Sequence, residues 1–158
     1  MLHVMTSACS HIGLRVTDLE RSQHFYEDVF GFREAFAFQT DGPETPQLLR
    51  LDAPLTLDAV YLAVDGLVLE LLHFDRPASK PSVDRSMNDP GLTHLSLFVD
   101  DFDAVIAAVP RHGGRVRTDT KVNNAIFVED PDGQAIEVIG PGGIFKAMRE
   151  EGLRKLAE

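Results

Sequence analysis

The sequence predicts an α+β fold in which two tandem βαβββ modules form a curved mixed sheet around a metal site. A run that starts at His11 and alternates in polarity returns at His94, and each run is followed by a helical pattern and three strand-like segments. Each module also ends in an apolar strand that carries one carboxylate, Glu70 in the first module and Glu137 in the second. Self-similarity of this kind indicates a duplicated structural unit.

The first module is expected over residues 10–74. Residues 11–16 alternate strictly in polarity, as a half-buried strand does. Residues 18–30 place apolar side chains at helical spacing and have capping residues at both ends. A turn-rich insertion over residues 40–46 interrupts the module. Three strands are expected after the helix, at residues 32–39, 59–65 and 67–74.

The second module is expected over residues 92–140, after a linker at residues 75–91 that contains three prolines. It repeats the order of a strand at residues 94–99 and a helical stripe that Pro110 ends. The segment Asp130-Pro131-Asp132-Gly133 is a strong hairpin signal. Residues 141–158 are expected to form a C-terminal helix, and residues 1–158 a single domain. The remaining strands are expected at residues 114–118, 125–129 and 134–139.

Composition narrows the range of functions. A formal net charge of −10 and the absence of a Lys/Arg-rich tract argue against nucleic acid as a partner. Cys9 is the only cysteine, which excludes an intramolecular disulfide. Residues 1–10 do not have the pattern of a signal peptide, and no apolar run is long enough to cross a bilayer. We therefore expect a cytoplasmic protein without a membrane partner that acts on a small molecule.

Strand alternation places four polar residues on one face of the predicted sheet. Residues two apart in a strand share a face, so His11 and His94 oppose the aliphatic side chains beside them. Glu70 and Glu137 each lie between two large aliphatic residues and oppose them in the same way. The aliphatic rows require a helix-packed core. The four polar residues are therefore expected on a second, concave face.

Two imidazoles and two carboxylates on one face make a candidate site for one divalent metal ion. A carboxylate in an apolar strand is costly unless a cation or solvent compensates it. His11, Glu70, His94 and Glu137 form an N₂O₂ donor set that leaves room for water or substrate oxygens. Ni²⁺, Co²⁺, Zn²⁺, Fe²⁺ and Mn²⁺ all tolerate such a donor set, so the donors alone do not identify the metal.

These motifs resemble the vicinal oxygen chelate superfamily, in which paired βαβββ modules curl around one metal. The resemblance covers about residues 10–140 and is closest to glyoxalase I (lactoylglutathione lyase). It rests on His11-x-x-Leu-Arg-Val-x-Asp-Leu-x-Arg-Ser-x-x-Phe-Tyr and on Phe127-Val-Glu-Asp-Pro-Asp-Gly133, which leads to Glu137. The resemblance implies a His/Glu/His/Glu ligand order, a lyase or isomerase reaction, and a homodimer.

The resemblance also suggests a role for each residue. A cation bound to two vicinal substrate oxygens would stabilise an enediolate, and a carboxylate would transfer the proton. Glu137 is the candidate base and Glu70 a second possible base. Arg15 matches an arginine that helps glyoxalase I to bind glutathione, whereas residues 88–93 lack the basic residue that glyoxalase I has there. The substrate class expected is a small carbonyl compound, a hemithioacetal or a thioester.

Three other functions remain open at this point. Methylmalonyl-CoA epimerase has a similar modular plan, but typically has Gln at the position of Glu70. An Fe²⁺ extradiol dioxygenase would use His11, His94 and Glu137 as ligands and would not need Glu70. Some relatives bind an antibiotic without a metal, but these generally lack the metal residues. Glu70 is therefore the residue that most favours a glyoxalase-like site.

Overall fold

The computed structural model describes residues 8–75, 86–142 and 144–156. The described residues divide into two compact units. The first unit contains residues up to 19 and those from 32 to 75, and the second contains residues 20–31 and those from 86 onward. Each unit is built around one four-stranded mixed sheet.

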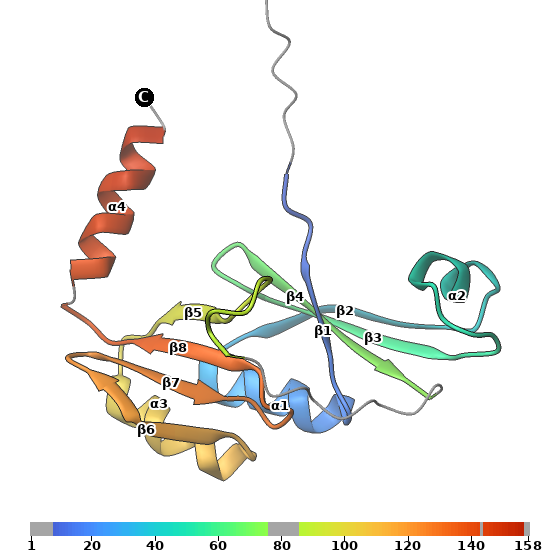
Figure 1. Cartoon of the computed structure of the whole chain (residues 1–158), viewed down its shortest axis with the longest axis horizontal. Helices are drawn as coiled ribbons and strands as arrows, with labels where there is room; N and C mark the ends of the chain where they lie inside the picture. The colour runs from blue at the N-terminus through green and yellow to red at the C-terminus, as the bar shows by residue number, and fades with distance from the viewer. Residues whose placement is uncertain (1–7, 76–85, 143, 157–158) are drawn as a thin grey trace, which may run out of the picture. The chain divides into compact units, whose positions relative to one another are not determined.

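The sheet of the first unit has the strand order β1-β4-β3-β2 (Figure 1). β1 runs parallel to β4, and the other neighbours are antiparallel. Leu69 and Leu71, which flank Glu70, have no exposed surface, so the expected alternation along this strand is confirmed. The bounds of the strands are β1 Ile12–Arg15, β2 Arg33–Thr40, β3 Leu57–Val64 and β4 Leu67–Phe74.

The sheet of the second unit repeats this topology with the order β5-β8-β7-β6. β5 runs parallel to β8, and the other neighbours are antiparallel. Ile136 and Val138, which flank Glu137, are fully buried. The identical strand orders confirm the predicted α+β fold of tandem modules. The bounds are β5 Leu95–Phe98, β6 Arg115–Val122, β7 Ala125–Glu129 and β8 Ala135–Ile139.

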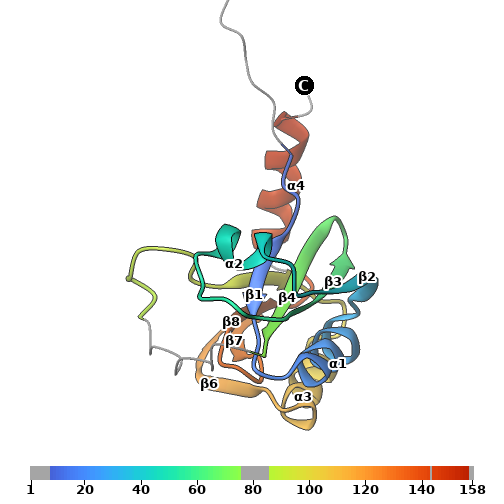
Figure 2. The same cartoon turned by 90° about the vertical axis from the view of Figure 1, so that its right-hand side faces the viewer.

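The helix α1 (Leu19–Phe30) belongs to the second unit from Glu20 onward, although it precedes β2 in the chain. Both views of the structure show it next to elements of the second repeat (Figures 1 and 2). Phe25 and Tyr26 are fully buried, and the Tyr26 hydroxyl donates a hydrogen bond to Asp130 Oδ2 at 3.0 Å. The hairpin residue Asp130 therefore anchors this helix.

The second unit contains three further helical segments among its described residues. α3 (Phe102–Ala108) starts at the N-cap Asp101, whose side chain accepts from the Ala104 amide, and the 3₁₀ helix η1 (Val109–His112) follows it. α4 is the C-terminal helix (Ile144–Leu156). None of the helices in the described ranges has both the length and the apolar character needed to cross a membrane.

The insertion of the first module differs from the sequence-based expectation of a turn-rich segment. It contains a short helix, α2 (Glu44–Leu49), between β2 and β3. Pro46 is compatible with this helix because it lies in the first turn, where its missing N–H would have no helical partner. The helix ends at Arg50, which adopts a left-handed conformation with φ of 54°.

Candidate metal centre

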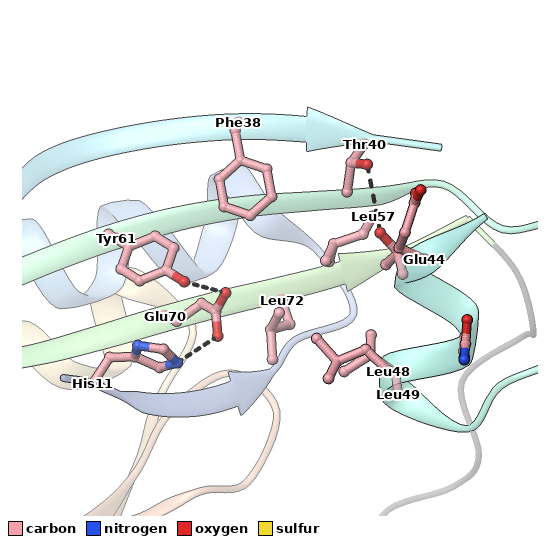
Figure 3. A pocket seen from close by; sticks show the side chains of 12 residues that line it. His11, Phe38, Thr40, Glu44, Leu48, Leu49, Leu57, Tyr61, Glu70 and Leu72 are labelled. Carbon is pink, nitrogen blue, oxygen red and sulfur yellow. Dashed lines mark hydrogen bonds and ion pairs between the residues drawn. The ribbon is translucent and has the colours of Figure 1, made fainter. Parts of the chain in front are cut away.

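In the first unit, the structure brings His11 and Glu70 together. His11 directly precedes β1, and Glu70 lies on β4 opposite Gly13 in the parallel ladder. His11 Nε2 is 3.1 Å from Glu70 Oε2 (Figure 3). The imidazole is about one-third exposed and the carboxylate is more buried, so the pair is open on the side of the histidine.

In the second unit, His94 and Glu137 form the equivalent pair. His94 directly precedes β5, and Glu137 lies on β8 opposite Ser96 in the parallel ladder. His94 Nε2 is 3.8 Å from Glu137 Oε2. Within neither unit does a third His, Cys, Asp or Glu among the described residues join the pair to form a group that could hold a metal by itself.

A hydroxyl group orients each histidine. Ser10 Oγ is 3.0 Å from His11 Nδ1, and Thr93 Oγ1 is 2.9 Å from His94 Nδ1. When Nδ1 carries the proton and donates to the hydroxyl oxygen, Nε2 keeps a lone pair toward the neighbouring carboxylate. This is the arrangement that a metal-ligating histidine requires, with its second nitrogen held by a hydrogen-bond partner.

Tyr61 holds the carboxylate of the first pair. It lies opposite Glu70 on the neighbouring strand β3, and its hydroxyl donates to Glu70 Oε1 at 2.5 Å (Figure 3). Burial and, after it, the hydrogen bond to Glu70 raise the pKa of Tyr61 to about 12, so the phenol is protonated at neutral pH. The Tyr61 ring also meets the His11 ring edge-on, with centroids 5.2 Å apart.

Ser96 holds the carboxylate of the second pair. Its hydroxyl donates to Glu137 Oε2 at 2.7 Å. Phe127 occupies the position equivalent to Tyr61, opposite Glu137 on β7, and its ring meets His94 edge-on with centroids 5.2 Å apart. Both histidines therefore contact an aromatic ring in the same way. The donor to the carboxylate differs, since it is Tyr61 in the first pair and Ser96 in the second.

The carboxylate of each pair borders a cavity of its own unit. The first cavity has a volume of about 840 Å³ and extends from His11 and Glu70 to the insertion helix α2 (Figure 3). Its wall is largely apolar, and the apolar residues are Phe38, Leu48, Leu49, Leu57 and Leu72. The second cavity, of about 620 Å³, includes Phe127 and Glu137 in its wall. Both carboxylates thus have space beside them for a small molecule.

The donor atoms of both pairs fit a divalent cation chemically. Nitrogen and oxygen ligands lie about 2.1 Å from Zn²⁺, so two neighbouring ligands of one ion are separated by roughly 3.0–3.4 Å. The His11–Glu70 separation of 3.1 Å falls in this range, and the His94–Glu137 separation of 3.8 Å is slightly wider. Neutral imidazole and carboxylate are also the donors that borderline divalent metals prefer.

Arg15, the predicted substrate-binding residue, lies at the end of β1 away from His11. Its guanidinium lies over the Phe74 ring at 5.2 Å and donates to the Leu72 carbonyl at 3.4 Å. Arg15 is not among the described residues that line the first cavity. Its role in substrate binding stays a prediction.

Sequence reasoning does not identify Ser10, Thr93 or Tyr61. A repeated signal for the first two is visible, since each predicted histidine directly follows a hydroxyl residue. Tyr61 has no such signal, because only the pairing register of β3 with β4 places its side chain beside Glu70.

Comparison of the chain with known proteins identifies a matching family and related sequences. A profile of the glyoxalase/bleomycin resistance protein/dioxygenase superfamily matches residues 8–138. A lactoylglutathione lyase of Haemophilus influenzae is 34% identical over 134 residues, which are 82% of this chain and 89% of that protein. The match therefore spans both repeats and both His/Glu pairs.

Solved structures show the same fold. A glyoxalase family protein from Bacillus cereus has a TM-score of 0.74 at 15% identity, covering 90% of this chain and 99% of that one. A fosfomycin resistance protein from Mesorhizobium loti has a TM-score of 0.59 at 21% identity, covering 92% and 99%. At these identities the likeness concerns the fold alone.

Proposed function

The chain belongs to the glyoxalase/bleomycin resistance protein/dioxygenase superfamily, and we propose that it is a metal-dependent lyase or isomerase of the glyoxalase type. The observation that carries the proposal is the pair of equivalent half-sites. Each presents one imidazole nitrogen and one carboxylate oxygen, at 3.1 Å in the first and 3.8 Å in the second.

We propose that His11, Glu70, His94 and Glu137 bind one divalent cation, with Ni²⁺, Co²⁺ and Zn²⁺ as the first candidates. When bound, such a cation supplies Lewis-acid stabilisation of negative charge on neighbouring substrate oxygens. The hydroxyls of Ser10 and Thr93 would keep both Nε2 atoms available for it. The protein is proposed to act as a homodimer.

The proposed reaction moves one hydrogen between adjacent carbons of a hemithioacetal. A carboxylate removes the proton from the carbon that carries sulfur and returns it to the neighbouring carbonyl carbon, while the hydroxyl proton of the first carbon is transferred to the carbonyl oxygen of the second. The first carbon thereby becomes a thioester carbonyl and the second an alcohol. Glu137 is the proposed base, as its resemblance to the glyoxalase I site suggests. A positioned carboxylate accelerates such transfers by about 10²–10⁴-fold. Arg15 is proposed to bind an anionic part of the substrate.

The first cavity supports a substrate with an apolar substituent. Five of its wall residues are large and apolar, and three of them, Leu48, Leu49 and Leu57, lie on the side of the cavity toward α2 and away from His11 (Figure 3). A carbonyl compound that carries an alkyl or aryl group could place this group against α2 while its polar end lies near Glu70. The name of the Haemophilus influenzae relative likewise points to a substrate derived from a thiol.

The test measures isomerisation of hemithioacetals by the metal-loaded protein and by Glu137→Gln and Glu70→Gln. We expect Glu137→Gln to lower kcat by about 10²–10⁴-fold while a metal remains bound, because the amide oxygen can still ligate but cannot take a proton. The same assay with acyl-CoA epimerisation substrates distinguishes the epimerase reaction. Wild-type activity in Glu137→Gln would contradict the base assignment.

A further inference from the structure

The two half-sites can be compared position by position, because their strands share one topology and register. Glu70 and Glu137 occupy equivalent places on β4 and β8. The adjacent parallel strand contributes Gly13 in the first half-site and Ser96 in the second. The adjacent antiparallel strand contributes an aromatic ring in both, one of which carries a hydroxyl.

The hydroxyl groups engage different oxygens of the two carboxylates. In the first half-site, Tyr61 donates to Oε1 of Glu70, and the other oxygen, Oε2, faces His11. In the second half-site, Ser96 donates to Oε2 of Glu137, which is also the oxygen nearest His94. In Glu70, the oxygen that faces the histidine therefore accepts no hydrogen bond from Tyr61 and is available to a cation. In Glu137, the oxygen that faces the histidine also accepts the hydrogen bond from Ser96.

Packing of the Tyr61 ring against its neighbours fixes the position of the Tyr61 hydroxyl. The ring stacks on Phe36 with centroids 4.2 Å apart and an interplanar angle of 17°, and it meets His11 edge-on. The phenol oxygen reaches Glu70 from this position at 2.5 Å. A donor fixed in this way orients the carboxylate at a small cost in side-chain entropy, since the ring has few rotatable bonds.

We propose that Tyr61 is a positioning residue that makes Glu70 the stationary carboxylate of the site. Its hydroxyl holds Oε1 of Glu70, the oxygen turned away from His11, and so keeps Oε2 directed toward His11, where a cation would be bound. Among the residues that the structure describes, no hydroxyl holds the oxygen of Glu137 that is turned away from His94, since Phe127 stands in the place equivalent to Tyr61 and Ser96 donates to the oxygen nearest His94. Glu137 is consequently the carboxylate that can turn toward a substrate proton, which divides the roles of two chemically identical side chains. This inference rests on the proposed function.

The test compares two variants that each delete one hydroxyl, Tyr61→Phe and Ser96→Ala. Tyr61→Phe keeps the ring contacts with Phe36 and His11 and reproduces the side chain of the second half-site. The affinity of the metal-free full-length protein for Co²⁺ is measured by competition with a chelator, and the visible spectrum of the Co²⁺ form reports the ligand set. Thermal unfolding of the metal-free variants serves as the control for the fold.

We expect Tyr61→Phe to weaken Co²⁺ binding by about 10–100-fold, the usual effect of losing a hydrogen bond to a metal ligand, without lowering the melting temperature of the metal-free protein comparably. Ser96→Ala should weaken Co²⁺ binding less than Tyr61→Phe does, because the Ser96 hydroxyl shares the Glu137 oxygen that faces His94, and it should lower kcat at saturating Co²⁺ instead. Equal Co²⁺ affinity of Tyr61→Phe and wild type, or an equal loss in both variants, would overturn the inference.

Glu70→Ala separates this inference from the proposed function, because alanine has no side-chain oxygen to ligate a metal. When Glu70→Ala loses Co²⁺ affinity and Tyr61→Phe does not, the assigned role of Tyr61 is wrong and the metal site stands. When Glu70→Ala binds Co²⁺ as tightly as wild type, Glu70 is not a ligand and the proposed site itself is wrong.

Discussion

Glu129→Gln is expected to destabilise the sheet that carries the second half-site. Glu129 is buried on β7, two residues from Phe127, and its carboxylate accepts hydrogen bonds from two arginines of β6. Arg115 donates at 2.6 and 2.7 Å, and Arg117 donates from Nε at 2.7 Å and also from Nη2. The variant keeps the shape of the side chain and removes its charge.

The expected loss is about 2–3 kcal/mol of unfolding free energy. Breaking a buried ion pair costs about 3–5 kcal/mol, and a hydrogen bond to a charged group contributes about 1.5–3 kcal/mol. The lower range applies here because the Arg115 side chain is 70% exposed and regains water, while the Gln oxygen remains one acceptor. For a chain of this size the loss corresponds to a melting temperature lower by roughly 4–12 °C.

The pH dependence provides a sharper assay. The hydrogen bond from Arg115, opposed by burial and aided by Arg117, lowers the pKa of Glu129 below its ordinary value of 4.5. A lowered pKa in the folded state contributes stability that is complete above pH 4.5 and is lost as the pH falls through the folded pKa. Urea unfolding of both proteins should therefore show a difference at pH 7 that narrows below pH 4.5. A difference that is constant over this range, or absent at pH 7, would refute the reasoning.

Two further predictions concern the first cavity and the α1 anchor. Leu48→Ser should raise KM about 3–10-fold for hemithioacetals with an aryl substituent, because Leu48 lines the cavity, and should leave thermal stability unchanged, because its side chain is 82% exposed. Met148→Ser on α4 is the control. Equal KM values in both variants would contradict the cavity assignment. Tyr26→Phe should lower the unfolding free energy by about 1–2 kcal/mol in urea titrations, since the buried Asp130 loses a donor. Burial raises the pKa of Asp130 above 3.8, so its contribution to stability should fall as the pH rises through that folded pKa, opposite in sign to the contribution of Glu129. A difference in unfolding free energy between wild type and Asp130→Asn that does not change with pH would contradict the burial argument.

Strand alternation accounts for what the sequence predicts well. Leu69 and Leu71 are buried around Glu70, and Ile136 and Val138 around Glu137, as a period of two requires. The pairing of each histidine with the carboxylate of its own repeat follows from the parallel ladder between the first and last strands of a module. A duplicated sequence makes this inference possible, because the second copy repeats the pattern of the first.

Other features depend on information that local patterns lack. Tyr61 reads in the sequence as one aromatic residue in an apolar strand, and its function follows only from its register opposite Glu70. The insertion helix α2 is six residues long and begins in a segment of Gly and Pro, where turn residues obscure helical periodicity. The association of α1 with the second unit depends on tertiary contacts such as the hydrogen bond from Tyr26 to Asp130.

The measurement that tests the central claim most directly is the metal stoichiometry of the wild type and of one histidine variant from each repeat. Metal-free protein is incubated with Co²⁺, Ni²⁺ or Zn²⁺, passed over a desalting column and analysed for metal. We predict one divalent ion per chain in the wild type and its loss in both His11→Ala and His94→Ala, because both pairs are proposed to bind the same ion. Retention of the ion in either variant, or failure of the wild type to bind any of the three metals, would contradict the account.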